Sequence, residues 1–173
     1  MKGLLISAND DALFTRDSVR VETEIFIHRS RREVFNLVTT PAQWHTWRTP
    51  HQATGSVSDV PNRPLAKGET VREVIAVADR FSEAVWTVIT CDAPQRWEIA
   101  TDTPAGTAHI TYRLTPTNSG CRCHRTLDFR SKHGLQRLLD SSLTRWILTR
   151  QSARALANLK GVMERLDSQL FTK

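Results

Sequence analysis

One short segment carries side chains that could bind a metal ion or an acidic group: Cys121, Cys123, His124 and Arg125. A structural zinc site normally has four converging ligands, and its cysteines usually follow a C-x₂₋₄-C spacing in a tight loop. Residues 121–130 instead have the pattern of a β-strand, in which His124 points away from Cys121 and Cys123. We therefore expect no metal here, and two small buried thiols.

Arg125 is the one charged residue on the apolar face of this predicted strand. The other residues on that face are Cys121, Cys123, Leu127 and Phe129. Because an unpaired buried guanidinium is very costly, three environments are open for Arg125. It pairs with a carboxylate such as Glu73 or Glu98, it reaches the solvated rim, or it orients the polar end of a mostly apolar ligand.

Other residues could line a binding cavity beside Arg125. Tyr112 lies on the apolar side of predicted strand 107–115, so its hydroxyl could face inward. Trp86 and Trp97 are either core residues or a pocket wall, and Ser152 interrupts the apolar stripe of a long helix, where a small side chain leaves space. The full set of candidate cavity residues is Trp44, Trp86, Trp97, Tyr112, Arg125, Phe129, Ser152 and Leu156.

The sequence shows no motif of nucleophilic, phosphate-binding or metal-dependent catalysis. It lacks G-x-S-x-G, a phosphate-binding glycine loop and H-E-x-x-H. Its six histidines are dispersed along the chain. We therefore expect no cofactor and assign no catalytic residue.

Two helix starts lie close together in residues 30–47. Ser30 and Glu33 have the spacing of a capping box, and Thr40, Pro41 and Gln43 repeat the device. The sequence therefore predicts two short helices. Trp44 and Trp47 lie three residues apart on one face of the second, Trp47 as a core anchor and Trp44 either beside it or at a cavity mouth.

Six segments have strand patterns: residues 19–28, 70–78, 82–91, 96–102, 107–115 and 121–130. A further short strand could lie at 53–58. The close spacing of the last five predicts antiparallel hairpins. Residues 148–170 carry one apolar stripe at helical spacing, and a helix of this length, roughly 34 Å, could cross the whole sheet. The order of elements predicts an α+β fold.

Composition limits the functional classes. The chain has 173 residues, a formal net charge of +6 and three cysteines. The odd number of cysteines argues against a disulfide framework, and no segment has the length and apolar character of a signal-peptide core or a membrane span. We predict a soluble cytoplasmic protein. Among basic residues only Arg29, Arg31 and Arg32 cluster, which makes nucleic acid an unlikely partner and a generally basic surface the simpler account.

The sequence resembles the START-like superfamily, also called SRPBCC or Bet v 1-like. The resemblance rests on the strand at 19–28, "REVFNLV", "WHTW", "CDAPQRW" and "LANLKGVMERL". It implies a helix-grip fold over residues 19–173, with a curved sheet of about seven strands, two short helices and a long C-terminal helix, after an N-terminal extension at 1–18. It also implies a cavity between the sheet and that helix.

Three functions follow from this resemblance and from the charge. The first is binding of a hydrophobic or amphipathic small molecule, such as a lipid or a polyketide-like compound, in the cavity. The second is a polyketide cyclase or aromatase that uses the same cavity, with Arg125 and Tyr112 as acid or base groups. The third is a basic surface, including Arg29, Arg31 and Arg32, that binds an anionic membrane or nucleic acid.

One set of apolar residues lies away from the face of the long helix that is expected to cover the sheet. Leu139, Leu143, Trp146 and Ile147 lie opposite the stripe that begins at Leu148, so something else must cover them. The candidates are the N-terminal segment, a break near residues 140–142 that separates two helices, and a second copy of the protein. In the last case a homodimer would form through Leu143, Trp146 and Ile147.

Overall fold

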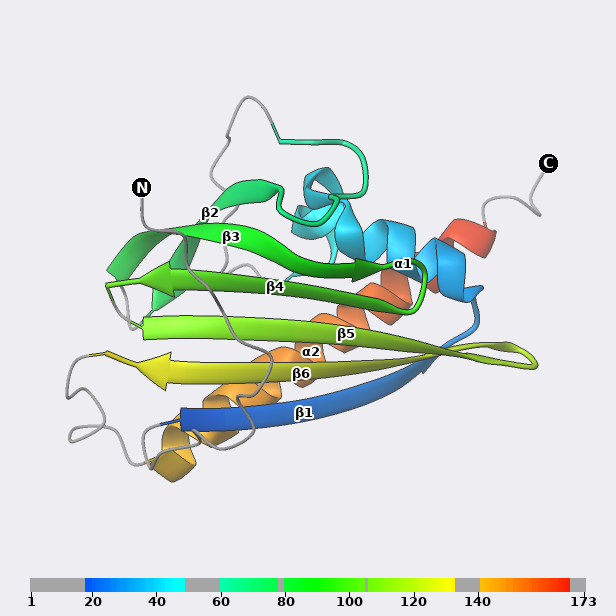
Figure 1. Cartoon of the computed structure of the whole chain (residues 1–173). Helices are drawn as coiled ribbons and strands as arrows, with labels where there is room; N and C mark the ends of the chain where they lie inside the picture. The colour runs from blue at the N-terminus through cyan, green and yellow to red at the C-terminus, as the bar shows by residue number, and fades with distance from the viewer. Residues whose placement is uncertain (1–17, 49–59, 78–79, 105, 133–140, 169–173) are drawn as a thin grey trace.

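The computed structural model describes residues 18–48, 60–77, 80–104, 106–132 and 141–168. Its centre is a six-stranded antiparallel sheet in the order β1-β6-β5-β4-β3-β2. The strands are β1 (Ser18–Ile27), β2 (Thr70–Val77), β3 (Arg80–Asp92), β4 (Arg96–Thr103), β5 (Gly106–Thr117) and β6 (Gly120–Ser131). Strands β2 to β6 pair as consecutive antiparallel neighbours, and β1 is the edge strand beside β6. The α+β helix-grip prediction is confirmed (Figure 1).

The predicted strand bounds agree with the structure to within two residues, but the strand number does not. The described residues form six strands instead of about seven. The further strand considered at 53–58 lies outside the described residues, as does the extension before Ser18. The alternation of apolar residues predicted all six described strands, because each strand buries one of its two faces.

The first predicted helix start is confirmed and the second is wrong in its chemistry. α1 (Arg31–Thr39) begins with the Ser30–Glu33 capping box, in which each side chain bonds the other residue's backbone N–H. The 3₁₀ helix η2 (Pro41–Thr46) follows at once. Thr40 also ends α1, and its hydroxyl donates to the Asn36 carbonyl at 2.7 Å, so it makes no side-chain cap for η2.

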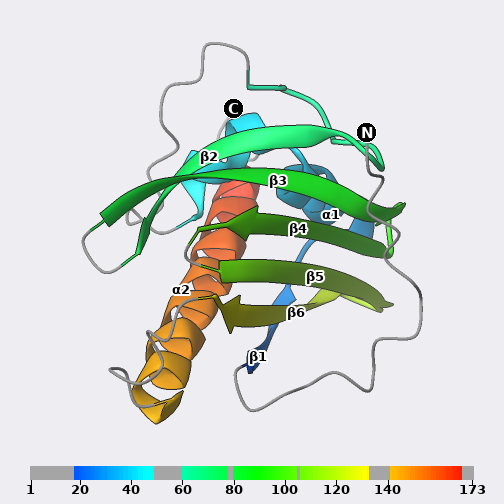
Figure 2. The same ribbon diagram turned by 60° about the vertical axis from the view of Figure 1, so that its left-hand side comes forward.

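The long helix α2 (Ser141–Ser168) lies across the concave side of the sheet (Figures 1 and 2). It begins seven residues before the predicted residue 148 and is continuous from Ser141, so Trp146 and Ile147 belong to the same helix as the apolar stripe. Both side chains are exposed. The residues before Ser141, which the break considered at 140–142 would separate from this helix, lie outside the described residues. Leu139 is outside the described residues. No helix in the described ranges is both long and apolar enough to span a membrane.

A β-bulge in β3 changes which of its side chains face the core, and alternate residues on both sides of predicted strand 82–91 are moderately apolar. Trp86 and Val88 point into the core while Val85 is exposed. The register with β4 shifts between Val88 and Thr90, and beyond the shift Cys91 packs against the core. An extra residue reverses which face the following side chains occupy. The residues of β3 that pack in the core therefore fall in both sets of alternate positions.

Candidate functional site

Aromatic side chains fill the concave side where η2 meets β4 and β5. Trp44, Trp47, Trp97 and Tyr112 are all almost fully buried. The Trp47 and Trp97 rings lie 6.4 and 6.1 Å from the Tyr112 ring. The Trp44 indole N–H donates to the Val38 carbonyl at 2.8 Å, which fixes this ring in the core and away from a cavity mouth.

A buried ion pair lies beside these rings. The Arg48 guanidinium donates to both Glu73 carboxylate oxygens at 2.8 and 2.7 Å, and the Trp86 indole N–H donates to Glu73 at 2.8 Å. Arg48 also stacks 4.0 Å from the centre of the Trp44 ring. Burial acts against the charged form, but the Glu73 carboxylate and the Tyr112 hydroxyl outweigh it and raise the pKa of Arg48.

Arg125 is buried in the same interior and has a different set of partners. Its Nε donates to the Tyr112 hydroxyl at 3.1 Å, and its Nη1 donates to the Ser152 hydroxyl of α2 at 2.5 Å. Ser152 in turn bonds the Thr23 hydroxyl of β1 at 2.8 Å. Arg125 is 7% exposed, so it does not reach a solvated rim.

Neither of the two carboxylates considered as partners of Arg125, Glu73 and Glu98, bonds it. Glu73 accepts from Arg48, and Glu98 bonds Arg96 on the opposite, convex face. Residue 98 follows Trp97 and therefore points the other way from it on β4. Among the described residues no carboxylate bonds Arg125.

We call six connected residues the polar cluster: Arg48, Glu73, Trp86, Tyr112, Arg125 and Ser152. It contains two guanidinium groups and one carboxylate, so it is left with an excess positive charge. Two further donors nearby, the indole N–H groups of Trp47 and Trp97, are buried with no hydrogen-bond partner among the described residues. The interior is therefore rich in donors and poor in acceptors.

The structure gathers most of the candidate residues in one place. Trp44, Trp97, Tyr112, Arg125 and Ser152 are buried around or beside the polar cluster. Trp86 belongs to the cluster through Glu73, and Leu156 is buried on α2 one turn after Ser152. Phe129 lies on the same face of β6 as Arg125 but is only half-buried. The alternation along each strand placed these residues on one side.

Neither of the two depressions described below is an enclosed cavity between the middle of the sheet and α2. The large side chains of the polar cluster and the four buried tryptophans occupy that side instead. Sequence patterns predicted which face of the sheet each side chain occupies. They did not predict how much of the space between the sheet and α2 the indole and guanidinium groups fill. Volume depends on rotamers and sheet curvature, which one strand's pattern does not contain.

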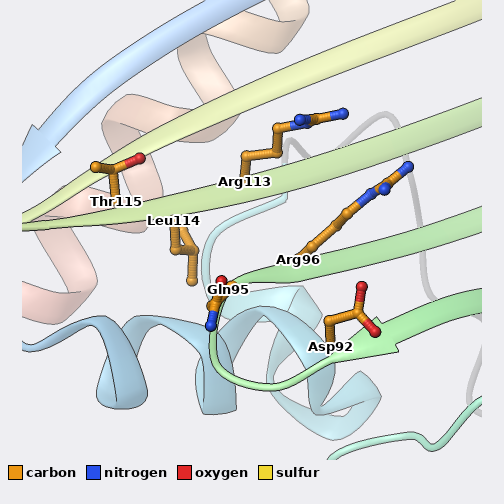
Figure 3. Close-up of a pocket in the computed structure, with 6 residues that line it drawn as sticks. All are labelled: Asp92, Gln95, Arg96, Arg113, Leu114 and Thr115. Atoms are coloured by element: carbon orange, nitrogen blue, oxygen red, sulfur yellow. The ribbon is translucent and has the colours of Figure 1, made fainter.

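Two depressions open at the surface. One, of about 250 Å³, lies at the β3–β4 turn beside β5, where Arg96 and Arg113 lie side by side (Figure 3). The other, of about 430 Å³, lies between β1 and α2 and is lined by Arg20, Val21, Glu22, Arg145 and Thr149. Val21 and Thr149 are two and three residues from Thr23 and Ser152, so this second depression adjoins the Thr23–Ser152 hydrogen bond.

Sequence reasoning missed Arg48 and considered Glu73 only as a possible partner of Arg125. Glu73 had a detectable signal, because it alternates with Val71 and so shares the buried face of β2. Arg48 had none, since it follows a short 3₁₀ helix and its direction depends on tertiary packing.

The cysteines lie as their alternation predicted. Cys121 and Cys123 are buried as free thiols, and His124 lies on the other face, 3.8 Å from Glu22. Within the described ranges no three His, Cys, Asp or Glu side chains converge as a metal site would require.

Solved structures with the same fold include three informative ones. A START superfamily protein from Mycobacterium smegmatis has a TM-score of 0.66 at 10% identity, with 85% of this chain and 98% of that chain covered. A protein of unknown function from Staphylococcus aureus has a TM-score of 0.68 at 12% identity, covering 87% and 96%. The di-domain ARO/CYC StfQ of the steffimycin biosynthetic pathway has a TM-score of 0.63 at 15% identity, covering 87% and 52%.

No curated protein matches the sequence. Residues 18–164 match the family described as polyketide cyclase / dehydrase and lipid transport. That span runs from the start of β1 to the last turns of α2, so it includes every strand and every residue of the polar cluster. The chain belongs to this polyketide cyclase / dehydrase and lipid transport family.

Proposed function

We propose that the protein binds an amphipathic small molecule, lipid-like or polyketide-like, between the sheet and α2, with Arg125 at the oxygen-bearing end of the ligand. Arg125 carries this proposal. It is buried, yet it bonds two neutral hydroxyl groups and no carboxylate among the described residues. A desolvated cation with neutral partners is costly, and an anionic or carbonyl oxygen from a ligand would offset that cost.

The surroundings of Arg125 support the same ligand chemistry. The indole N–H groups of Trp47 and Trp97, which have no partner among the described residues, are donors, as is the Tyr112 hydroxyl. Aromatic rings and Leu156 supply apolar surface next to these donors. A site with few polar groups on an apolar background is typical of small-molecule binding. The family's description, which includes lipid transport, supports this ligand class.

The proposed entrance is the depression between β1 and α2. Val21 and Thr149 line this depression on the same two elements that carry Thr23 and Ser152, and Ser152 bonds both Thr23 and Arg125. In this proposal a ligand that reaches Arg125 from the depression breaks the Thr23–Ser152 hydrogen bond and accepts from the hydroxyl groups that it frees. Only neutral hydroxyl groups are involved, so opening costs roughly 1 kcal/mol in hydrogen bonding.

Two measurements test this proposal on the full chain. Organic extraction of the purified protein followed by mass spectrometry should release an amphipathic compound that carries an acidic or carbonyl group. In solution, the fluorescent fatty acid cis-parinaric acid should bind more tightly than its methyl ester. Arg125→Leu should weaken acid binding by roughly 10- to 100-fold, as loss of a charge-assisted hydrogen bond predicts, and should remove the preference over the ester.

Arg113→Leu is the matched control. Arg113 is on β5, one residue from Tyr112, but is exposed on the convex face, so this change should leave both probes unaffected. Equal binding of acid and ester to the unchanged protein would contradict the proposed role of Arg125. So would equal losses in the two variants.

A polyketide cyclase is the second candidate, because the Tyr112 hydroxyl lies between two guanidinium groups, with Arg125 Nε at 3.1 Å. A phenol so placed could transfer a proton to or from a poly-β-ketone chain bound in the grip. Tyr112→Phe should then abolish the cyclised product of a reconstituted ketosynthase reaction while probe binding is kept. An unchanged product profile would remove this candidate.

A further inference from the structure

Most of α2, from its start to Met163, has an unusual charge pattern. From Ser141 to Met163 the helix contains four basic residues and no acidic one, and its first carboxylate is Glu164. Arg145, Arg150 and Arg154 are exposed, and none is in an ion pair within the described part of the chain. This helix surface is therefore cationic with no counter-charge of its own.

Two large apolar side chains lie among these arginines. Trp146 is 56% exposed and Ile147 is 38% exposed, whereas the other four tryptophans are buried. Trp146, Arg150 and Arg154 follow one another at four-residue spacing and so share one face. The Arg150 guanidinium lies 5.4 Å from the centre of the Trp146 ring. We call Arg145, Trp146, Ile147, Arg150 and Arg154 the α2 surface.

We propose that the α2 surface docks on a lipid bilayer with anionic headgroups. Indole rings partition to the boundary between headgroups and acyl chains, where one part of the ring is apolar and the N–H stays hydrated. Arginines beside such a ring are attracted to a negatively charged leaflet. In Figure 2 the first turns of α2 extend past the edge of the sheet, so a flat surface can reach them.

Charge favours a bilayer over a second copy of the protein as the occupant. A symmetric dimer places the same patch of each copy against the other. Arg150 and Arg154 would then face the same residues of the partner without any acidic residue of this helix segment to balance them. Two large apolar side chains are also few for a stable interface, which normally buries about 1,200–2,000 Å².

This docking surface goes beyond ligand binding and does not require it. It does adjoin the proposed entrance, because Arg145 lines the depression between β1 and α2 and precedes Trp146 directly. Glu22 of β1 is the acidic residue on that rim, and it lies near His124. A molecule leaving a bilayer at the α2 surface would therefore meet the depression first.

The test uses the full chain and two kinds of vesicle, phosphatidylcholine alone and phosphatidylcholine with 30% phosphatidylglycerol. Flotation should recover the protein with the anionic vesicles only, and high salt should release it. Because four tryptophans are buried, Trp146 should dominate the change in fluorescence. We expect a blue shift and weaker acrylamide quenching on binding, and neither change in Trp146→Phe.

Charge variants separate the α2 surface from the general charge of the protein. Arg150→Gln with Arg154→Gln should weaken vesicle binding by about 25-fold, since each arginine near an anionic leaflet contributes roughly a factor of five. Arg32→Gln with Arg113→Gln removes the same charge from exposed positions elsewhere and should have little effect.

Three outcomes would overturn the proposal. Equal losses of vesicle binding in the two double variants would show that the general positive charge of the protein, and not the α2 surface, binds the vesicles. A dimer in sedimentation velocity whose Trp146 is already protected from acrylamide would make a second copy the occupant. Tight binding to duplex DNA without vesicle binding would replace the bilayer with nucleic acid.

Vesicle docking that survives Arg125→Leu would show that docking stands even if the proposed ligand site fails.

Discussion

The two faces of the sheet each bury a carboxylate, and the two sites differ in their charge balance. On the convex face we define the outer cluster as Glu98, Thr90, Arg96 and Thr111. Glu98 accepts from Thr90 at 2.7 Å, from Thr111 at 3.2 Å and from Arg96 Nε at 2.9 Å. One cation and two neutral hydroxyl groups satisfy one carboxylate. The outer cluster is therefore complete without any further group.

The polar cluster on the concave face also holds one carboxylate, but with two guanidinium groups. Glu73 is satisfied by Arg48 and Trp86, which leaves Arg125 without an acidic partner among the described residues. β5 contributes to both clusters, Thr111 outward and Tyr112 inward. Burial of charge alone therefore does not indicate a binding site. The indication comes from charge that the protein itself leaves unbalanced.

Removing the carboxylate of the polar cluster should have the largest effect on stability. Glu73→Gln leaves the Arg48 guanidinium buried without its ion-pair partner, and breaking a buried pair in this way costs about 3–5 kcal/mol. Urea denaturation should show this loss in the free energy of unfolding.

Glu83→Gln on β3 is the control, because its ion pair with Arg72 is exposed and should contribute less than about 1 kcal/mol. If the two variants were equally stable, the polar cluster would not be the buried ion pair that distinguishes the concave face.

The outer cluster should give a smaller effect that depends on pH. Burial acts to raise the pKa of Glu98, but hydrogen bonds from Thr90 and Arg96 outweigh it and lower that pKa below its usual 4.5. Glu98→Gln should cost about 1–3 kcal/mol near neutral pH, because a charged acceptor is lost. Since the folded pKa is depressed, this contribution is complete above about pH 4.5 and is lost as pH falls through the folded pKa.

Unfolding curves of the wild type and Glu98→Gln should therefore converge as the pH falls below 4.5 and through the folded pKa of Glu98. Thr90→Val tests the cause, because it removes one hydrogen bond that lowers the pKa and should raise the pH at which the curves converge. A stability difference that did not change with acidification would show that Glu98 contributes by packing and not as a carboxylate.

Arg125→Leu should change stability less than Glu73→Gln or Glu98→Gln, within about 1 kcal/mol in either direction. Replacing a buried charge that has no acidic partner relieves a desolvation cost, although Tyr112 and Ser152 each lose a donor. Residues kept for binding often cost stability. A loss as large as that of Glu73→Gln would mean that Arg125 is part of a structural ion-pair network, and the two faces would then be alike.

The sequence predicted the architecture well because each element carries its own periodic signal. The Ser30–Glu33 capping box located α1, and alternation located all six described strands and the inward facing of Tyr112 and Arg125. These are local properties, and a strand that buries one face must show them in its own residues.

The partners of the inward residues could not be predicted, because they depend on contacts between elements distant in sequence. Arg48 and Glu73 are 25 residues apart, and Arg125 meets Ser152 across 27 residues. The β3 bulge likewise depends on pairing with β4. Sequence alternation shows which face a charge occupies, but the choice between a protein carboxylate and a ligand requires the register of several strands at once.

The smallest expected effect is an absence of reaction at Cys123, two residues from Arg125 on the same face of β6. Burial raises the pKa of this thiol to about 12, with Cys121 beside it adding to the rise, so almost no thiolate is present near neutral pH. In Cys91→Ser, which removes the half-buried thiol of β3, Ellman's reagent should therefore modify the native protein far more slowly than the same protein in urea. The rate also reports opening of the concave side, since the reagent reaches Cys123 only when the covering side chains move apart. Rapid reaction in the native state would show that solvent enters the grip freely; water could then serve as the partner of Arg125, and the charge imbalance between the two faces would no longer require a ligand.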